Sequence, residues 1–160
     1  MALARRLAPL LVLVAVAVSA AAQSVLEGTV TRVVDGDTIH VRVGGQIETV
    51  RYIGVNTPEV HHPRKGEEPG GRAAAAVNRD LAGRRVRLEL DTQSRDRYGR
   101  LLAYVWVDDT MVNAELVRRG FAQVMTVPPN VRHQALFLKL QREARDAGRG
   151  LWAEPAPASR

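Results

Sequence analysis

The chain has 160 residues, which favours a single domain, and its composition, 46% hydrophobic and 25% charged, is ordinary for a globular protein. The formal net charge of +6 favours a polyanionic partner such as nucleic acid, although many basic proteins bind none. The absence of cysteine excludes disulfides, thiolate metal sites and cysteine nucleophiles.

The first 22 residues have the pattern of a secretory signal peptide. Arg5 and Arg6 precede a short apolar run over residues 7–18, and small residues follow up to Ala22, where cleavage is expected. A membrane-spanning helix needs about 20 apolar residues, more than this run offers. We therefore expect export to the periplasm or the medium, with the loss of both arginines lowering the net charge to +4. An uncleaved N-terminal anchor is the alternative.

Three strands in a meander are expected first, over residues 25–34, 38–43 and 46–55. Turn residues separate them, because Asp35-Gly36-Asp37 and Gly44-Gly45 both tolerate tight turns. Alternation in the third strand places Ile47, Arg51 and Ile53 on one face. An arginine on a partly apolar face normally needs an anionic partner.

The rest of the chain alternates loops, strands and helices. Residues 60–71 predict an exposed loop, followed by a helix from about 72 to 81 and strands over 86–90 and 101–107. Asn113 has the character of an N-cap for a helix through Arg119. The last helix is expected over residues 131–147, with an apolar stripe for packing on the barrel: Leu136, Phe137, Leu140, Ala144 and Ala147.

These elements predict a mainly β fold with helices (α+β), a five-stranded β-barrel of the oligonucleotide/oligosaccharide-binding (OB) type with three helices. Periodicity alone is also typical of other five-stranded α+β folds. The domain is expected over residues 23–153, after the signal peptide (1–22) and before a Pro-rich tail (154–160) expected to be disordered.

Oxygen-bearing side chains gather at two of the expected strand ends. Asp37 starts the second strand, and Asn56 and Glu59 lie at and just past the end of the third. If these ends converge, carboxylate and amide oxygens offer ligands for calcium or a similar hard cation. Glu59 follows the stiff Pro58, so its carboxylate is also a candidate general base for water. Turn formation alone explains the same residues about equally well.

Two arginines change this balance. Arg51 lies on the strand that leads to Asn56, and Arg100 ends the loop before the fifth strand. Guanidinium groups bind a phosphodiester and stabilise the charge that grows in its transition state. One arginine alone would more simply pair with a nearby carboxylate or cap a turn. Two arginines together with the acidic cluster favour a site that cleaves phosphodiesters.

Three blocks of the sequence resemble the signature blocks of staphylococcal-nuclease-like (thermonuclease) proteins. They are Asp35-Gly36-Asp37-Thr38, residues 51–59, and Asp96-Arg97-Tyr98-Gly99-Arg100 with the Leu102-Ala103-Tyr104 that follows. Residues 111–118 and Gly150-Leu151-Trp152 resemble the same family, so the likeness covers roughly residues 25–152. The order and spacing of three blocks make this resemblance specific.

The resemblance implies a calcium-dependent endonuclease that hydrolyses DNA and RNA and leaves 3′-phosphate ends. By position, it implies that one Ca²⁺ is bound by Asp37, Asn56 and the backbone carbonyl of Thr57. The resemblance leaves open whether another divalent cation takes the place of Ca²⁺ at these ligands. Arg51 and Arg100 would hold the scissile phosphate, and Glu59 would act as the base or orient the water.

The resemblance also implies contacts to the substrate strand. Arg97 and Tyr98 would contact its terminal phosphate, and Asp35 would lie behind the metal ligands. We expect single-stranded DNA and RNA as preferred substrates, a monomeric protein, and no stable membrane association after signal cleavage.

The sequence departs from the family's best-known member at two places. That member has aspartate at the position of Asn56, so one negative charge is lost here and calcium affinity should fall. It also has tyrosines in the region of residues 124–129, where this chain has no aromatic residue. Stacking on an aromatic side chain is worth about 1–3 kcal/mol per base, so substrate affinity should fall too.

Two functions remain from the sequence: the exported nuclease, and a barrel that holds nucleic acid or protein without cutting. Asn56 and the missing tyrosines motivate the binding module. Against it, aromatic content is only 4%, and a single-strand binder would be expected to carry more stacking residues. A binder would also have little need for Arg51, Glu59 and Arg100 together, so the nuclease is favoured.

Overall fold

The structure, a computed structural model, describes residues 24–59 and 70–153. The predicted signal peptide, the predicted C-terminal tail and most of the predicted loop at 60–71 lie outside these ranges. Within them, no helix has the length and apolar character needed to cross a membrane.

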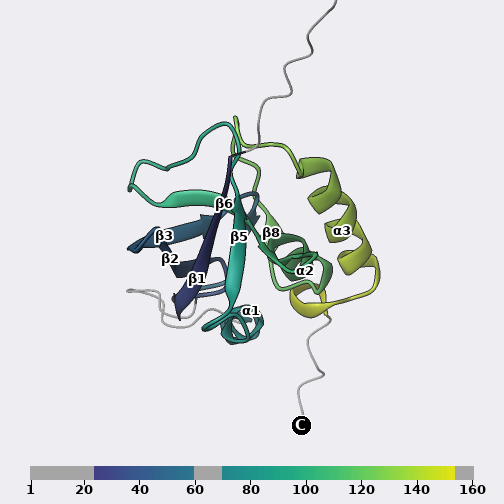
Figure 1. Ribbon diagram of the computed structural model, residues 1–160. Coiled ribbons are helices and arrows are strands. Elements are labelled where there is room, and N and C mark those ends of the chain that lie inside the picture. The colour runs from purple at the N-terminus through teal and green to yellow at the C-terminus, as the bar shows by residue number, and fades with distance from the viewer. Residues whose placement is uncertain (1–23, 60–69, 154–160) are drawn as a thin grey trace, which may run out of the picture.

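Five strands form a closed barrel: β1 (Val25–Val33), β2 (Thr38–Val43), β3 (Gln46–Tyr52), β5 (Arg85–Glu89) and β6 (Leu101–Val107). They follow the order β3-β2-β1-β5-β6 with antiparallel neighbours, and β3 pairs with β6 in parallel to close the ring (Figure 1). The closing pair sets Arg51 opposite Leu102, so the end of β3 lies beside the start of β6. The predicted five-stranded barrel is confirmed.

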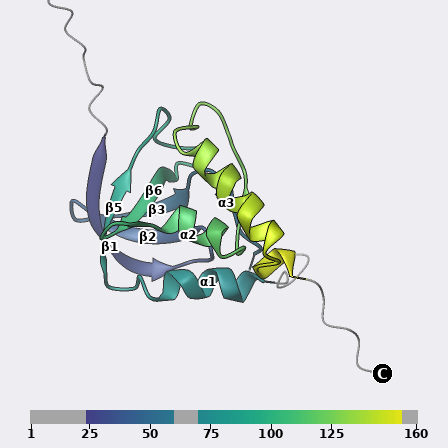
Figure 2. The same cartoon turned by 90° about the vertical axis from the view of Figure 1, so that its right-hand side faces the viewer.

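Three helices complete the fold: α1 (Gly71–Arg79), α2 (Val112–Arg118) and α3 (Gln134–Asp146). Helix α2 packs against both β6 and α3, while α1 contacts β1 (Figure 2). The remaining elements are short: β4 (Val55–Asn56), β7 (Thr110–Met111), β8 (Gln123–Val124) and the 3₁₀ helix η1 (Gly150–Trp152). Strand β4 pairs with β8 in antiparallel orientation, and this pairing sets Asn56 opposite Gln123.

The core fills the barrel and continues under α2 and α3. Its most deeply buried large side chains are at most 1% exposed: Val30, Ile39, Val41, Val50, Tyr52, Val55, Leu88, Tyr104, Val105, Leu116, Val117 and Phe137. Burial of each such side chain contributes about 1.5–3 kcal/mol, so this cluster supplies the main drive for barrel closure.

The third predicted strand is interrupted, which the sequence pattern did not indicate. Strand β3 ends at Tyr52, and Gly54 turns the chain with φ of +78° before β4 begins. A Cβ atom on Gly54 would lie 2.7 Å from the Phe137 ring of α3, so close packing also requires glycine there. The expected apolar face is wrong at Ile47, which is 50% exposed at the hairpin end of β3.

Asn113 is not the N-cap that the sequence predicted. Met111 holds that position without a side-chain cap, and Asn113 lies inside the first turn of α2, fully buried. Its Oδ1 accepts from the Val105 N–H (2.9 Å), and its Nδ2 donates to the Ile53 carbonyl (2.9 Å). The side chain therefore joins α2 to β6 and to the turn after β3.

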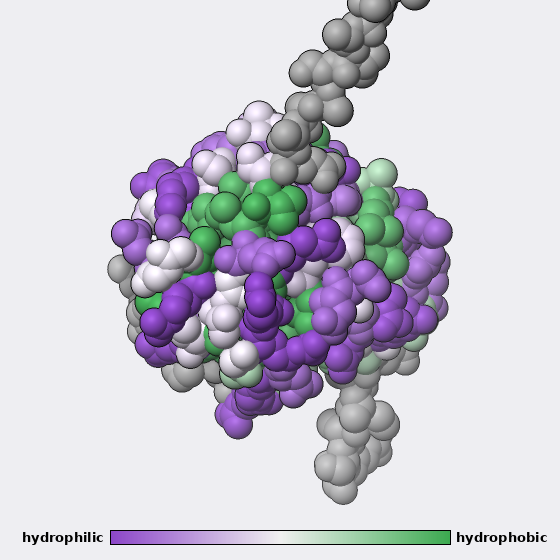
Figure 3. Space-filling model, viewed as in Figure 1, coloured by the Kyte–Doolittle hydropathy of each residue, from purple (hydrophilic) through white to green (hydrophobic). Residues whose placement is uncertain are grey.

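The last helix begins at Gln134, three residues later than predicted, and part of its predicted stripe faces solvent. Phe137 and Ala144 are buried, but Leu136 is 40% exposed, because the helix inserts Phe137 at Gly54. Leu138 is 37% exposed on the same helix. Hydrophobic surface is visible over α3 in Figure 3.

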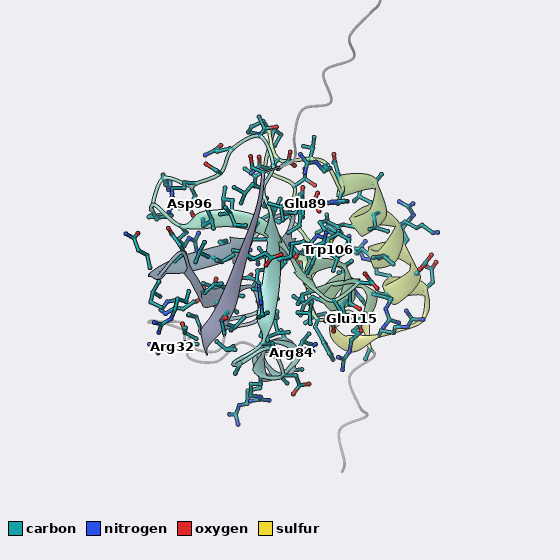
Figure 4. All side chains as sticks on the ribbon, in the orientation of Figure 1. Arg32, Arg84, Glu89, Asp96, Trp106 and Glu115 are labelled. Atoms are coloured by element: carbon teal, nitrogen blue, oxygen red, sulfur yellow. The ribbon has the colours of Figure 1, made fainter. Side chains whose placement is uncertain are left out.

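A polar cluster joins the barrel to the start of α3. The buried Glu89 carboxylate accepts from Arg132 Nη1 (2.8 Å) and Trp106 Nε1 (2.9 Å), and lies 3.1 Å from His133 Nε2. Figure 4 shows Glu89 and Trp106 close together between the barrel and α3. Burial raises the pKa of Glu89, but hydrogen bonds from Arg132, His133 and Trp106 outweigh it and bring that pKa below its ordinary value of 4.5.

Replacing Asn113 tests its bridging role against the N-cap hypothesis. Aspartate is as good an N-cap as asparagine, but it offers no donor to Ile53 and places a charge in the core. We expect both Asn113→Asp and Asn113→Ala to lower the free energy of unfolding by about 2–3 kcal/mol in urea titrations. Gln123→Glu makes the same chemical change at an exposed position and should have little effect. An Asn113→Asp protein as stable as wild type would restore the N-cap interpretation.

The lowered pKa of Glu89 makes part of the stability depend on pH. Its contribution is complete above the unfolded-state pKa of about 4.5 and is lost as the pH falls through the lower, folded-state pKa. We expect Glu89→Gln to lower the free energy of unfolding by about 2 kcal/mol at pH 7 and to make its decline below pH 4.5 shallower. Glu27→Gln, in the exposed pair with Arg85, is the control. Parallel pH curves for wild type and Glu89→Gln would contradict this account.

Candidate active site

The predicted site residues converge where strands β2 and β3 meet. Register places Thr38 at the start of β2 opposite Arg51 near the end of β3, and the Tyr52 N–H donates to the Asp37 carbonyl (2.9 Å). The turn after Tyr52 then returns the chain, so that Asn56 and Thr57 face the same end of the barrel. Barrel closure thus brings together side chains that are far apart along the chain.

Arg51 is the buried centre of this group. Its Nη1 atom donates to the carbonyl oxygens of Tyr52 (2.7 Å) and Val55 (2.8 Å), the two ends of the turn. Its Nη2 atom donates to Asn56 Oδ1 (3.1 Å) and lies 3.1 Å from Asp37 Oδ2. Among the described residues no acceptor engages its Nε–H. Burial lowers the pKa of Arg51, an effect that Asp37 opposes and the nearby Arg100 reinforces.

The carboxylate of Asp37 is almost fully enclosed, with 6% of the residue exposed. Its Oδ2 accepts from the Thr57 N–H (2.9 Å) as well as pairing with Arg51, and its Oδ1 accepts from the Thr38 hydroxyl (3.1 Å). Asp37 Oδ2 and Asn56 Oδ1 each lie 3.1 Å from the same Arg51 nitrogen, so this nitrogen bridges the two oxygens. The side chains of Asp37 and Asn56 and the backbone of Thr57 are therefore linked by shared hydrogen-bond partners, and their role as metal ligands stays a prediction.

A second layer of polar groups fixes the Asp35–Asp37 turn. The Asp35 carboxylate accepts from the Asp37 N–H (3.0 Å), and the Asp35 carbonyl accepts from Asn78 of α1 (2.8 Å). Asn78 in turn accepts from the buried Tyr52 hydroxyl (2.8 Å). Burial, and then the negative charge of Asp37, raise the pKa of Asp35. At Gly36 a Cβ would lie 2.6 Å from the Thr57 hydroxyl oxygen, so only glycine fits this turn.

Arg100 reaches the site from the loop that precedes β6. Asp96 organises this loop, because its Oδ1 accepts from the N–H groups of Tyr98 (2.9 Å) and Arg100 (3.0 Å). Its Oδ2 pairs with Arg100 Nε at 2.7 Å, which leaves the two Nη groups of Arg100 without an acceptor among the described residues. Figure 4 shows Asp96 at the end of the barrel away from α3.

Arg97 and Tyr98 form the tip of this loop. Tyr98 is 68% exposed, and the Arg97 guanidinium lies 4.7 Å from the centre of its ring. Arg97 Nη2 donates to the Tyr98 hydroxyl, and Arg100 lies 5.5 Å from the same ring. An exposed ring flanked by two guanidinium groups suits a base together with its phosphates.

An open cleft of about 500 Å³ lies beside the two arginines, and the predicted metal ligands Asp37, Asn56 and Thr57 are not among its lining residues. Arg51 and Arg100 lie on its wall, as do the loop residues Asp96, Arg97 and Tyr98. Its apolar side is formed by Ile53, Leu102, Met125 and Val127. Met125 and Val127 are 43% and 58% exposed. They therefore offer apolar contact surface within residues 124–129, the region in which the sequence has no aromatic residue.

Glu59 is exposed and lies beside the start of α1, since a Cβ on Gly71 would meet its carbonyl at 2.7 Å. The backbone places it two residues after Thr57, which the Asp37 carboxylate holds. Its role as general base stays a prediction.

The structure contains the contacts that would explain the two arginines without a phosphodiester, namely pairing with a carboxylate and stabilising a turn. Arg51 does pair with a carboxylate, and Arg100 does stabilise a turn. Each nevertheless lines the cleft and has N–H groups that no acceptor among the described residues engages, so these contacts orient the arginines as well as neutralising them. Sequence reasoning missed Asp96 and Asn78 as supports. The spacing of Asp96 and Arg100 offered a signal for the first, whereas no local pattern marks Asn78.

A family model described as staphylococcal nuclease homologue matches residues 49–154. The thermonuclease of Staphylococcus intermedius is 44% identical over 124 residues, which cover 77% of this chain and 74% of that protein. The thermonuclease of Staphylococcus hyicus is 40% identical over 78% of this chain and 74% of its own length. Endonuclease YncB of Bacillus subtilis is 39% identical over 79% of this chain and 61% of its own length.

Proposed function

The chain belongs to the staphylococcal nuclease homologue family, and on that basis we propose that it is a calcium-dependent endonuclease that hydrolyses the phosphodiester bonds of DNA and RNA. The observation that carries the proposal is the convergence of Arg51 and Arg100 on one cleft beside the oxygen ligands of Asp37 and Asn56. Two guanidinium groups that each have N–H groups without an acceptor suit a phosphodiester that gains negative charge in its transition state.

The donor set fits one hard cation. Asp37, Asn56 and the Thr57 carbonyl provide only oxygen ligands, as calcium prefers. Their single carboxylate makes the set weakly charged, and no group of three His, Cys, Asp or Glu side chains in the described ranges could hold a metal ion. When bound there, calcium would supply positive charge to the phosphate oxygens.

Arg51 and Arg100 divide the phosphate contacts between them. Arg51 has its Nη groups bound to protein, so it offers its Nε–H from a rigid, buried position. Arg100 has its Nε bound to Asp96, so it offers both Nη groups from a half-buried position. A phosphate held between the two would accept at least one hydrogen bond from each side, which fixes its orientation before the reaction.

Glu59 would accept the proton of the attacking water or orient it. Its position shortly after Asn56 and Thr57 keeps its backbone close to the oxygen ligands. Pro58 restricts the backbone immediately before it, which limits the positions of its carboxylate. Attack in line with the 5′ oxygen as the leaving group would leave 3′-phosphate ends, as the family resemblance implies.

Single-stranded nucleic acid suits the cleft best. Tyr98 offers an exposed ring for stacking, and Arg97 beside it would contact a terminal phosphate. Met125 and Val127 offer apolar contact to a base without the stacking energy of an aromatic ring. Because a base must leave the duplex to reach such surfaces, unpaired strands avoid that cost. We expect the protein to act as a monomer and not to stay on the membrane after signal cleavage.

Export fits the same function. Residues 1–22 have the signal-peptide pattern, and a nuclease in the periplasm or the medium meets nucleic acid from outside the cell. The absence of cysteine makes folding independent of disulfide formation.

A cleavage assay tests this proposal. The protein without residues 1–22 should degrade single-stranded DNA and RNA when calcium is present and stop when EDTA is added. Glu59→Gln and Arg100→Ala should each lower kcat by about 100-fold or more, because each removes a group that acts on the transition state. Arg42→Ala, on the exposed barrel surface, should be unchanged. A protein that shifts DNA in a gel but leaves it intact with calcium would be the non-catalytic binding module instead.

Asn56→Asp tests the metal ligands by binding rather than by activity. The added carboxylate restores a second negative charge beside Asp37, which should tighten calcium binding about tenfold in calorimetric titrations. Gln46→Glu adds the same charge at the exposed β2–β3 hairpin and should bind calcium like wild type. Equal affinity in Asn56→Asp and wild type would remove Asn56 from the ligand set.

A further inference from the structure

An ion pair outside the cleft joins the two halves of the site. Arg95 donates from Nη1 and Nη2 to the two carboxylate oxygens of Glu48, at 2.9 and 2.8 Å. Glu48 lies on β3, three residues before Arg51, and Arg95 lies in the loop five residues before Arg100. The pair therefore connects the strand that carries one phosphate-binding arginine to the loop that carries the other.

Arg95 also binds the backbone near the tip of its own loop. Its Nη1 atom donates to the Gly99 carbonyl at 2.9 Å, next to Arg100. The base of the loop is fixed by the backbone, through the bridge between Arg95 and Leu101 and the bond from the Leu102 N–H to the Ser94 carbonyl (2.8 Å). Between these anchors the loop runs from the end of β5 to the start of β6 on the side of the barrel away from α3 (Figure 1).

The geometry of the pair sets it apart from ordinary surface pairs. An isolated exposed pair contributes little, because water screens it and both side chains lose freedom. Here the guanidinium engages both carboxylate oxygens and a carbonyl, an arrangement that fixes direction as well as distance. The Arg95 side chain is 48% exposed and the Glu48 side chain 22%, so the pair lies at the surface and its strength depends on this geometry. The hydrogen bond from Arg95 lowers the pKa of Glu48.

We propose that Glu48 and Arg95 are positioning residues that clamp residues 94–100 against β3, so that Arg100 and Arg51 face the same phosphate. The inference rests on the proposed nuclease function for its catalytic consequence, but the clamp itself is a property of the fold. Neither residue lines the cleft, so both act through the loop. A shift of about 1 Å in a group that contacts the transition state can lower the rate by about 100-fold, so a loosened loop should be felt in kcat.

Two variants remove the clamp in different ways. Glu48→Gln keeps the size of the side chain but loses its charge, and Arg95→Lys keeps the charge but cannot reach both oxygens and Gly99 together. Glu27→Gln is the matched control, since it breaks the cross-strand pair with Arg85 on the exposed side of the barrel.

Amide exchange measures the loop directly. The N–H groups of Tyr98 and Arg100, both bonded to Asp96, should exchange at least about fivefold faster in the two clamp variants. The N–H of Val105, bonded to the buried Asn113, should exchange at its wild-type rate and show that the barrel is intact. Cleavage of single-stranded DNA with calcium should lose about tenfold in kcat, with a smaller change in KM and a melting temperature within about 2 °C of wild type.

Each outcome decides one part of the inference. Wild-type exchange at Tyr98 and Arg100 in both variants would overturn the clamp. Faster exchange with unchanged kcat would overturn its positioning role. If the wild-type protein cleaves no substrate, the proposed function fails, whereas the exchange rates still support or overturn the clamp without it.

Discussion

The guanidinium of Arg51 lies buried where β3 ends, next to the carboxylate of Asp37, and it binds both carbonyls of the turn that follows. Burying either charge alone would cost several kcal/mol, so the Arg51 guanidinium and the Asp37 carboxylate must be buried as a pair. That requirement couples three features of the fold: the start of β2, the break after β3, and the position of Asn56. Local structure and the candidate site are therefore built by the same set of contacts.

Barrel closure supplies the rest of the site. The parallel pairing of β3 with β6 places the start of β6 beside Arg51, and the loop before β6 brings Arg100 to the cleft. Asp96 shapes this loop from within, while Glu48 attaches it to β3 through Arg95. One arginine is thus rigid by burial and the other by a hydrogen-bonded loop. In the proposed reaction, this division would give a fixed contact on one side of the phosphate and an approach from solvent on the other.

Much of this was predictable from the sequence, because the determining signals are local. Turn residues at 35–37 and 44–45, together with alternating strands, predicted the first three strands, and the polar residues at the strand ends predicted that Asp37, Arg51 and Asn56 lie together. The errors involve contacts between distant segments. Asn113 has the composition of an N-cap but is used as a bridge to Ile53. The break at Gly54 depends on the approach of Phe137 from α3, more than 80 residues later. The pair of Glu48 with Arg95 likewise has no local pattern, because sheet register alone brings them together.

The central claim is that Arg51 and Arg100 hold one phosphate beside the oxygen ligands of a metal ion. A crystal structure of Glu59→Gln with calcium and a short single-stranded oligodeoxynucleotide tests it most directly. We predict an ion bound by Asp37, Asn56 and the Thr57 carbonyl, and a backbone phosphate that accepts from the Arg51 Nε–H and the Arg100 Nη groups. A strand bound elsewhere, with no phosphate in contact with either arginine, would contradict the account.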